Sequence, residues 1–252
     1  MTTTTHTNKK TVLPDCWQTL EDCLNAGVNR IILFGPPGTG KTYAGIKFGD
    51  VSRGAHRLIC TEDMTNLDVT GAFMPANNGN FMWVSGSALK AWEGDGLKGA
   101  RLVVDEIDKA GGDVFATLLA MLDSEESASW QNPDTGRTHT PKQGFSAIMT
   151  TNVEDVTELP EALKDRFPVS IRIDQPHPDA LERLSVDLRN VAIQLADAGE
   201  QRISLRTFME FDKLRKALGE DKASRYIFAS RAESILDAMK INTISSSVGS
   251  HA

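Results

Sequence analysis

The fold is decided by residues 31–42, IILFGPPGTGKT, near the start of a chain of 252 residues. Residues 31–34 are a short apolar run, typical of a buried strand, and the glycines and prolines after them end it. Residues 41 to about 51 are expected to form a helix. Residues 35–42 fit the pattern G-x-x-x-x-G-K-[ST], in which backbone N–H groups and a helix N-terminus converge on phosphate groups. A glycine-rich turn could match by chance, but the flanking strand and helix predict a phosphate-binding loop.

Every residue of this loop is a candidate nucleotide contact: Gly35, Pro36, Pro37, Gly38, Thr39, Gly40, Lys41 and Thr42. The ammonium group of Lys41 is expected to reach the outer phosphates, and the hydroxyl of Thr42 is expected to bind Mg²⁺. The loop therefore predicts a nucleotide and Mg²⁺ as ligands.

A second motif, RLVVDE at residues 101–106, is an apolar strand that ends in two carboxylates. Such a strand end is usually only solvated surface. Beside a phosphate-binding loop, however, Asp105 is placed to hold the Mg²⁺ shell, and Glu106 is placed to polarise an attacking water as general base.

The rest of the chain alternates short apolar strands with helical patterns. Strands are expected at residues 57–60, 102–104, 145–150 and 170–173, and helices at residues 15–25 and 115–122. This alternation predicts an α/β fold, a parallel sheet with helices on both faces. Three helical patterns without a strand follow, at residues 181–198, 205–218 and 223–239.

We therefore expect two structured parts and two tails. The expected bounds are a disordered tail at residues 1–11, an α/β core at 12–176, a helical lid at 177–244 and a frayed tail at 245–252. Within the core, the turn signature PDTG at residues 133–136 predicts a hairpin. His139 follows it without a partner at metal-ligand spacing and is expected to be a surface residue.

Charge, cysteine content and the distribution of apolar residues make some classes of protein less compatible with this sequence. The formal net charge of −7 disfavours binding to nucleic acid, which needs a basic field. Cys16, Cys23 and Cys60 form no C-x-x-C pair and are expected to be reduced, buried thiols. The sequence has no run of about 18 apolar residues, and its polar start, MTTTTHTNKK, lacks the apolar segment of a signal peptide. These features predict a cytoplasmic protein without a membrane contact.

Residues 66–89, NLDVTGAFMPANNGNFMWVSGSAL, mix large apolar residues with turn formers. With GPPGTGKT, VVDEID, MTTN and LPEALKDRF in this order, the chain resembles the AAA+ ATPases. Residues 66–89 make it similar to the MoxR branch and the related small subunit of aerobic cobaltochelatase. The resemblance covers roughly residues 12–210.

This resemblance implies that residues 66–89 are a hairpin inserted in the second helix of the core. Its turn would lie at residues 77–79, and residues 74–83 would meet a partner or substrate at a ring face or pore. The alternative is that Phe73, Phe81 and Trp83 only pack the insert onto its own domain.

The resemblance also implies roles for two further core residues. Asn152, in MTTN, resembles sensor 1, which orients water against the γ-phosphate; a turn or capping asparagine is the alternative. Arg166, in LKDRF, resembles the arginine finger that serves a neighbouring subunit's nucleotide and can be worth ~10³-fold in rate. The alternative for Arg166 is a local ion pair with Asp165 or Glu161.

Arg206, in the expected lid, resembles sensor 2. Many relatives have proline where this chain has Leu205, and Arg202 is close by, so the choice between the two arginines stays open. An ordinary surface arginine is a further alternative.

By resemblance, the chain is expected to hydrolyse ATP in a ring of identical subunits, expected to be a hexamer. Its work would be to remodel or activate a partner protein or complex, for example in metal insertion, and partners with a von Willebrand A-type domain are common in this group. The alternatives are a nucleic-acid-associated motor, as in related restriction-type GTPases, and a nucleotide-gated scaffold with little turnover. ATP rather than GTP is an expectation from the family.

Overall fold

The computed structural model describes residues 13–77, 79–196, 198 and 202–248, with side chains described as far as residue 241. The described chain divides into two units, Thr19–Asp174 and the residues before and after it. Helix α1 (Asp15–Asn25) crosses the first division. The second division lies close to the predicted boundary after residue 176, and the tail expected at residues 1–11 lies outside the described residues.

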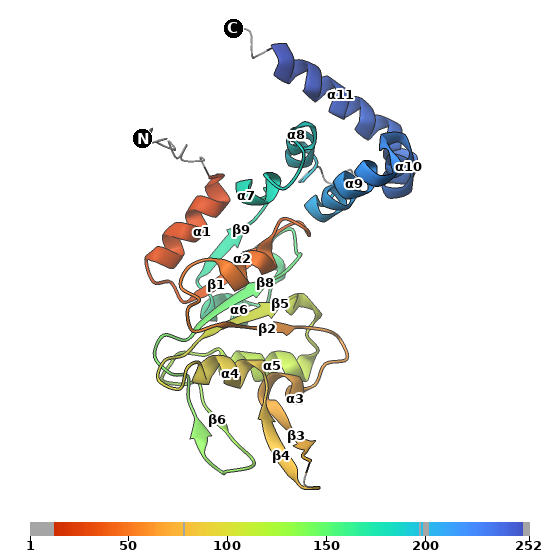
Figure 1. Ribbon diagram of the computed structural model, residues 1–252. Helices are drawn as coiled ribbons and strands as arrows, with labels where there is room; N and C mark the ends of the chain where they lie inside the picture. The colour runs from red at the N-terminus through yellow and green to blue at the C-terminus, as the bar shows by residue number, and fades with distance from the viewer. Residues whose placement is uncertain (1–12, 78, 197, 199–201, 249–252) are drawn as a thin grey trace, which may run out of the picture. The chain divides into compact units, whose positions relative to one another are not determined.

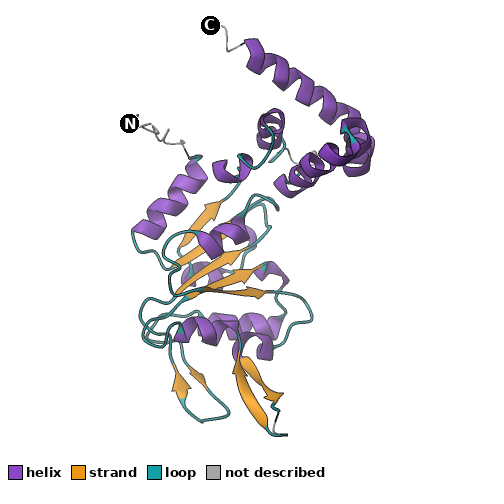
Figure 2. Cartoon of the chain, in the orientation of Figure 1, coloured by secondary structure: helices purple, strands orange, loops and turns teal. Residues whose placement is uncertain are grey.

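The core unit, Thr19–Asp174, is built on a parallel five-stranded sheet in the order β2-β5-β8-β1-β9. Figure 1 labels these strands, and Figure 2 shows helices on both sides of the sheet. Their bounds are β1 (Arg30–Phe34), β2 (Ala55–Ile59), β5 (Arg101–Asp105), β8 (Ser146–Thr150) and β9 (Val169–Arg172). The predicted α/β fold is confirmed, and each predicted strand agrees with the structure to within two residues.

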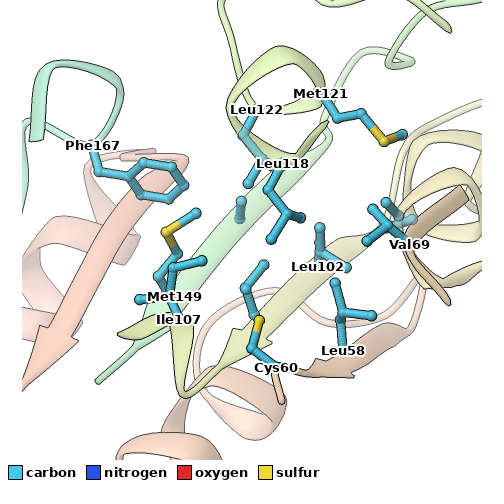
Figure 3. Close-up of a cluster of buried hydrophobic side chains, with 14 of the residues drawn as sticks. Leu58, Cys60, Val69, Leu102, Ile107, Leu118, Met121, Leu122, Met149 and Phe167 are labelled. Atoms are coloured by element: carbon cyan, nitrogen blue, oxygen red, sulfur yellow. The ribbon is translucent and has the colours of Figure 1, made fainter. Parts of the chain in front are cut away.

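Alternate residues of each strand face opposite sides of the sheet. In β5, Leu102 and Val104 belong to a large buried cluster. Val103 faces α2 (Lys41–Lys47) on the other side, where a Cβ added to Gly45 would lie 3.0 Å from Val103 Cγ1. Figure 3 shows Leu118 of α5 (Gly112–Met121) reaching into the cluster. Removing these apolar side chains from water is the main stabilisation of the core.

Two antiparallel hairpins extend the core unit. The first joins β3 (Gly71–Pro75) to β4 (Phe81–Ser85) and stands between α3 (Asn66–Thr70) and α4 (Ser87–Glu93). The second joins β6 (Trp130–Gln131) to β7 (Thr138–His139). Both predicted hairpins are present, although position 78 of the first turn lies outside the described residues.

An aromatic contact links the two hairpins, which lie at the same end of the core unit in Figure 1. The rings of Trp83 and Trp130 are 5.5 Å apart, and the Phe73 ring lies 5.3 Å from that of Trp83. His139 is partly covered, with its Nδ1 3.2 Å from a carboxylate oxygen of Glu93.

The second unit contains helices and, among its described residues, no strand. Its longer helices are α8 (Val186–Gln194), α9 (Leu205–Leu218), α10 (Glu220–Phe228) and α11 (Ala232–Val248), after the short α7 (Pro178–Leu181). They share a buried core in which the rings of Phe211 and Phe228 lie 4.8 Å apart. An ionic group supports it: Arg215 donates to Asp187 at 2.7 and 2.9 Å.

Several predicted helix bounds were wrong. The helix after the loop ends at Lys47, not residue 51, because Phe48 adopts an extended backbone. The next expected helix begins at Gly112 rather than residue 115. Residues 181–198 do not form one helix, because the backbone of Ser185 is extended. Ser185 is the N-cap residue of α8.

The two C-terminal expectations also need correction. Residues 223–239 divide between α10 and α11, because Ala229 turns the chain with a left-handed φ of 49°. The tail expected to fray from residue 245 is helical as far as Val248, since adding a residue to a formed helix is much easier than nucleating one. Residues 249–252 lie outside the described chain.

Candidate phosphate-binding site

The site lies at the carboxyl ends of β1, β5 and β8, neighbouring strands that end at the same edge of the sheet. The loop 35–42 follows β1, Asp105 ends β5, and Asn152 lies two residues beyond β8. In open parallel sheets this edge is where ligands bind. The fold thus brings together three motifs that are spread over residues 35–152 of the sequence.

The loop needs a glycine where it leaves the sheet. Gly35 has a φ of +110°, and a Cβ there would lie 3.2 Å from the carbonyl oxygen of Ile173. Further along, the Thr39 hydroxyl donates to the carbonyl of Pro36 at 3.1 Å and ties the loop across its base. The loop then enters α2, whose first-turn N–H groups have no partner within the helix and favour an anion.

Lys41 connects the loop to β8. Its Nζ donates to the carbonyls of Gly35 and Pro36, at 2.7 and 2.8 Å, and to Asn152 Oδ1 at 3.1 Å. The residue is only 6% exposed, and charge-assisted bonds of this kind offset the cost of burying an ammonium group. Lys41 and Asn152, which were predicted separately as site residues, therefore lie in one site.

Both carboxylate oxygens of Asp105 accept hydrogen bonds. Its Oδ1 accepts from the Thr42 hydroxyl at 2.7 Å and from the Thr150 hydroxyl. Its Oδ2 accepts from Arg57 Nε at 3.0 Å and from a second nitrogen of the same guanidinium. Burial alone would raise the pKa of Asp105, but the bonds from Thr150, Thr42 and Arg57 outweigh it and lower the pKa. Asp105 is therefore a carboxylate at neutral pH.

Glu106 has an unusual backbone. Its φ and ψ are 57° and 49°, the left-handed region, which costs a residue with a side chain about 1 kcal/mol or more. The amide of Glu106 donates to the Thr150 hydroxyl at 3.3 Å. Its side chain is exposed, and within the described chain no hydrogen bond or ion pair holds the carboxylate. The strained backbone presents a carboxylate that remains open to a water molecule.

The residues present fit a hydrated Mg²⁺. This cation prefers oxygen ligands and usually combines one or two protein groups with waters and phosphate oxygens. Thr42 and the ionised Asp105 are bonded to each other and supply such oxygens.

Two residues of the site were missed by sequence reasoning, namely Arg57 and Thr150. Thr150 could have been found, because it belongs to the polar sequence that ends a predicted strand. Arg57 could not, because its contact depends on β2 being the neighbour of β5. The only signal was an arginine inside a short predicted strand.

Arg166 is the last residue of α6 (Glu161–Arg166) and is bound within its own chain. It donates to Asp123 Oδ2 at 2.8 Å and to the carbonyls of Leu119 and Ala162 at 3.0 and 2.9 Å. Its ion-pair partner is thus Asp123, across 43 residues, and not the nearby carboxylates expected from sequence. Its role towards a neighbouring subunit remains a prediction.

Arg206 belongs to the second unit, where it is exposed at the start of α9. Arg202 lies ahead of the same helix and is partly buried. The choice between them as sensor 2 also remains a prediction.

Cys60 lies next to the site, because its amide donates to the carbonyl oxygen of Asp105 at 2.9 Å. Cys16, Cys23 and Cys60 form no disulfide, but only Cys60 is buried, which corrects the expectation for the other two because they lie on the partly exposed α1. Burial, and then the negative charge of Asp105, raises the pKa of Cys60 to about 12. No helix in the described part of the chain is both long and apolar enough to span a membrane.

Fold and site together define a P-loop nucleotide-binding protein. The model of the AAA domain family (dynein-related subfamily) matches residues 30–167, from β1 to the end of α6. This match covers more than half of the 252 residues. The chain belongs to this family.

A solved structure of another protein shares the fold. NtrX from Brucella abortus, determined in complex with ADP, is 15% identical, with a TM-score of 0.52 over 79% of this chain and 48% of NtrX. The chain thus spans about half of that protein. A proposed ATPase of Cytophaga hutchinsonii is 18% identical, with a TM-score of 0.46 over 89% of this chain and 68% of that one. No curated protein sequence matches the chain.

Proposed function

We propose that the chain is an ATP hydrolase that works in a ring of identical subunits to remodel or activate a partner protein. The observation that carries the proposal is the meeting of three groups at one sheet edge. They are the ammonium of Lys41, the carboxylate of Asp105 bonded to Thr42, and the open carboxylate of Glu106.

Lys41 and the loop bind the phosphates. In this structure Lys41 donates to two loop carbonyls and to Asn152, and phosphate oxygens can replace these acceptors. Backbone N–H groups at the start of α2 add further donors.

Thr42 and Asp105 hold Mg²⁺. When bound, this cation offsets the negative charge that develops on the phosphates during transfer. Because Asp105 accepts the hydroxyl proton of Thr42, the lone pairs of that hydroxyl oxygen face away from the carboxylate and are available to the cation.

Glu106 and Asn152 act on the attacking water. Glu106 accepts a proton from the water, which requires a carboxylate that no protein donor already occupies. Asn152 has an amide group beside Lys41 and orients the water relative to the terminal phosphate. The left-handed backbone of Glu106 keeps its side chain in this position.

Arg166 serves the nucleotide of the next subunit in the ring, which we propose to be a hexamer. To do so, its guanidinium must exchange Asp123 for a phosphate. The side chains of this ion pair are 24% and 36% exposed, so solvent reaches the guanidinium and a phosphate group from a neighbouring subunit can compete with Asp123.

The β3–β4 hairpin supports a partner-binding role. Cross-strand pairing places Phe73 beside Trp83 on one face and Met74 beside Met82 on the other. The first face is anchored through Trp83 on Trp130, whereas both methionines are more than half exposed. Exposed apolar groups of this kind mark contact surfaces. We therefore propose a MoxR-like role, with a partner of the von Willebrand A type in the cytoplasm.

Steady-state ATP hydrolysis per subunit, measured over a wide range of protein concentration, tests this proposal. The Glu106→Gln variant gives the blank. We expect the rate per subunit to rise steeply with concentration as rings complete, and an Arg166→Ala variant to lose the rise. If the rate per subunit does not change with concentration and the protein is monomeric in size-exclusion chromatography, the proposed ring is wrong. If no rate exceeds that of the Glu106→Gln blank, the alternative of a nucleotide-gated scaffold with little turnover is favoured.

A further inference from the structure

We propose that Arg57 is a stand-in cation for the Mg²⁺ site. It neutralises Asp105 in the metal-free protein and leaves that carboxylate when Mg²⁺ binds. The inference rests on the proposed function, since it concerns the same site.

The first argument is that Asp105 has no acceptor position left. A carboxylate has about four lone-pair positions. Thr42 and Thr150 donate to Oδ1, and two nitrogens of Arg57 donate to Oδ2. Four donors therefore fill the carboxylate. A Mg²⁺ ion, or a water bound to it, can reach Asp105 only if one of these donors leaves.

The second argument identifies the donor that leaves. Thr150 is 2% exposed, and Thr42 belongs to the first turn of α2. Arg57 extends from β2, one of the two edge strands of the sheet, and its side chain is 43% exposed. Water can therefore solvate the released guanidinium. The backbone need not follow, because the carbonyl of Arg57 is held by the Ser87 hydroxyl at 3.0 Å.

The third argument is electrostatic. The side chain of Asp105 is only 5% exposed, and a buried carboxylate without a cation is costly. Arg57 supplies that charge when no metal is bound. A bound Mg²⁺ would repel the guanidinium and would need the carboxylate oxygen that Arg57 holds, so the two cations would compete. Arg57 should consequently stabilise the metal-free site and weaken the affinity of the site for Mg²⁺.

The test is a Mg²⁺ titration of the full chain with a fluorescent ADP analogue, N-methylanthraniloyl-ADP, at fixed concentration. In Arg57→Met, which removes the charge and keeps the length, we expect the free Mg²⁺ at half-maximal signal to fall roughly fivefold. That ratio corresponds to about 1 kcal/mol. The melting temperature of the nucleotide-free variant in EDTA should fall as well.

A matched control is Arg53→Met. Arg53 lies just before β2 and donates to the carbonyl of Gly99 at 2.7 Å and pairs with Asp50, away from Asp105. The control loses the same charge, so its Mg²⁺ titration should match that of the wild-type chain. If the affinity for Mg²⁺ rises equally in both variants, the loss of a positive charge alone explains the result and the proposed competition is wrong.

An unchanged or weaker affinity of Arg57→Met for Mg²⁺ would overturn the inference. If that variant does not fold, Arg57→Lys replaces it. A single ammonium cannot make both bonds to Asp105, so the same tightening is expected to a lesser degree, and its absence would overturn the inference equally. Failure of the proposed function appears elsewhere, as wild-type protein whose nucleotide binding does not respond to Mg²⁺.

Discussion

The phosphate site and the β3–β4 hairpin differ in the kind of side chain that each buries or exposes to water. In the site, charged side chains are buried: Lys41 and Asp105 are 6% and 3% exposed, and each has several hydrogen-bond partners. In the hairpin, apolar side chains are exposed: Phe81 and Met82 are 69% and 53% exposed. Burying a charge and exposing an apolar group both cost free energy.

Under the proposed function, the two regions serve separate tasks within one unit. Such local departures from the rules of stable folding are where function is expected. The buried charges concentrate an electrostatic field on a small anionic ligand. The exposed apolar groups form the surface that we propose to contact a partner protein. We therefore expect changes in one region to leave the other region's activity intact.

The largest effect is expected from Lys41→Met. Removing the ammonium group takes a charge-assisted contact from the phosphates, and the affinity for ADP should fall about 100-fold. Fluorescence titration with N-methylanthraniloyl-ADP measures this affinity. Lys47→Met is the control, because it removes the same charge from the other end of α2 and should bind ADP normally. Equal affinities of the two variants would show that the loop lysine is not a phosphate ligand.

A large loss of stability is expected from Gly71→Ala at the base of the hairpin. Gly71 has a φ of +126°, and a Cβ there would lie 2.3 Å from the carbonyl oxygen of Val84. We expect a decrease in the free energy of unfolding of about 2 kcal/mol or more. Chemical denaturation followed by tryptophan fluorescence measures it.

Gly96→Ala is the control for this variant. Gly96 also has a positive φ, +93°, but nothing lies within 4 Å of its Cβ position, so only the backbone strain of about 1 kcal/mol is expected. Folded Gly71→Ala should bind ADP as tightly as the wild-type chain. If its ADP affinity fell, the hairpin and the phosphate site would not be independent.

A smaller effect with a defined pH dependence is expected from Asp105→Asn. The pKa of Asp105 is lowered in the folded state, so its charged bonds contribute stability at every pH above the unfolded value of about 3.9. The contribution is lost only as the pH falls through the lower, folded pKa. We expect the variant to be less stable by about 1 kcal/mol, by the same amount from pH 8 to pH 5. A difference that shrinks between pH 7 and pH 5 would mean that the pKa is raised instead.

Much of this architecture could be predicted from the sequence. The five strands, the loop and both hairpins have local signals: apolar runs, glycine-rich turns and a lysine at fixed spacing. The bounds of α9 were predicted without error, because its apolar residues repeat with helical spacing and Ser204 caps its start through the amide of Thr207.

What could not be predicted depends on contacts between distant residues. The break at Ser185 is fixed by its hydrogen bond to Asp212, 27 residues away, at 2.8 Å. The pairing of Arg57 with Asp105 requires the order of the strands, which no local pattern gives. Likewise, the partner of Arg166 is Asp123, after α5, because α5 and α6 pack together.

The most direct test compares ATP turnover and ATP binding in two variants, Glu106→Gln and the double substitution Met74→Ser with Met82→Ser. Both methionines are exposed, so the double variant should keep its stability within about 0.5 kcal/mol. The account predicts that it turns over ATP at the wild-type rate, whereas Glu106→Gln binds ATP and loses about 10³-fold in turnover. Turnover that survives in Glu106→Gln, or that disappears with the two methionines while ATP still binds, would contradict the division between the phosphate site and the hairpin.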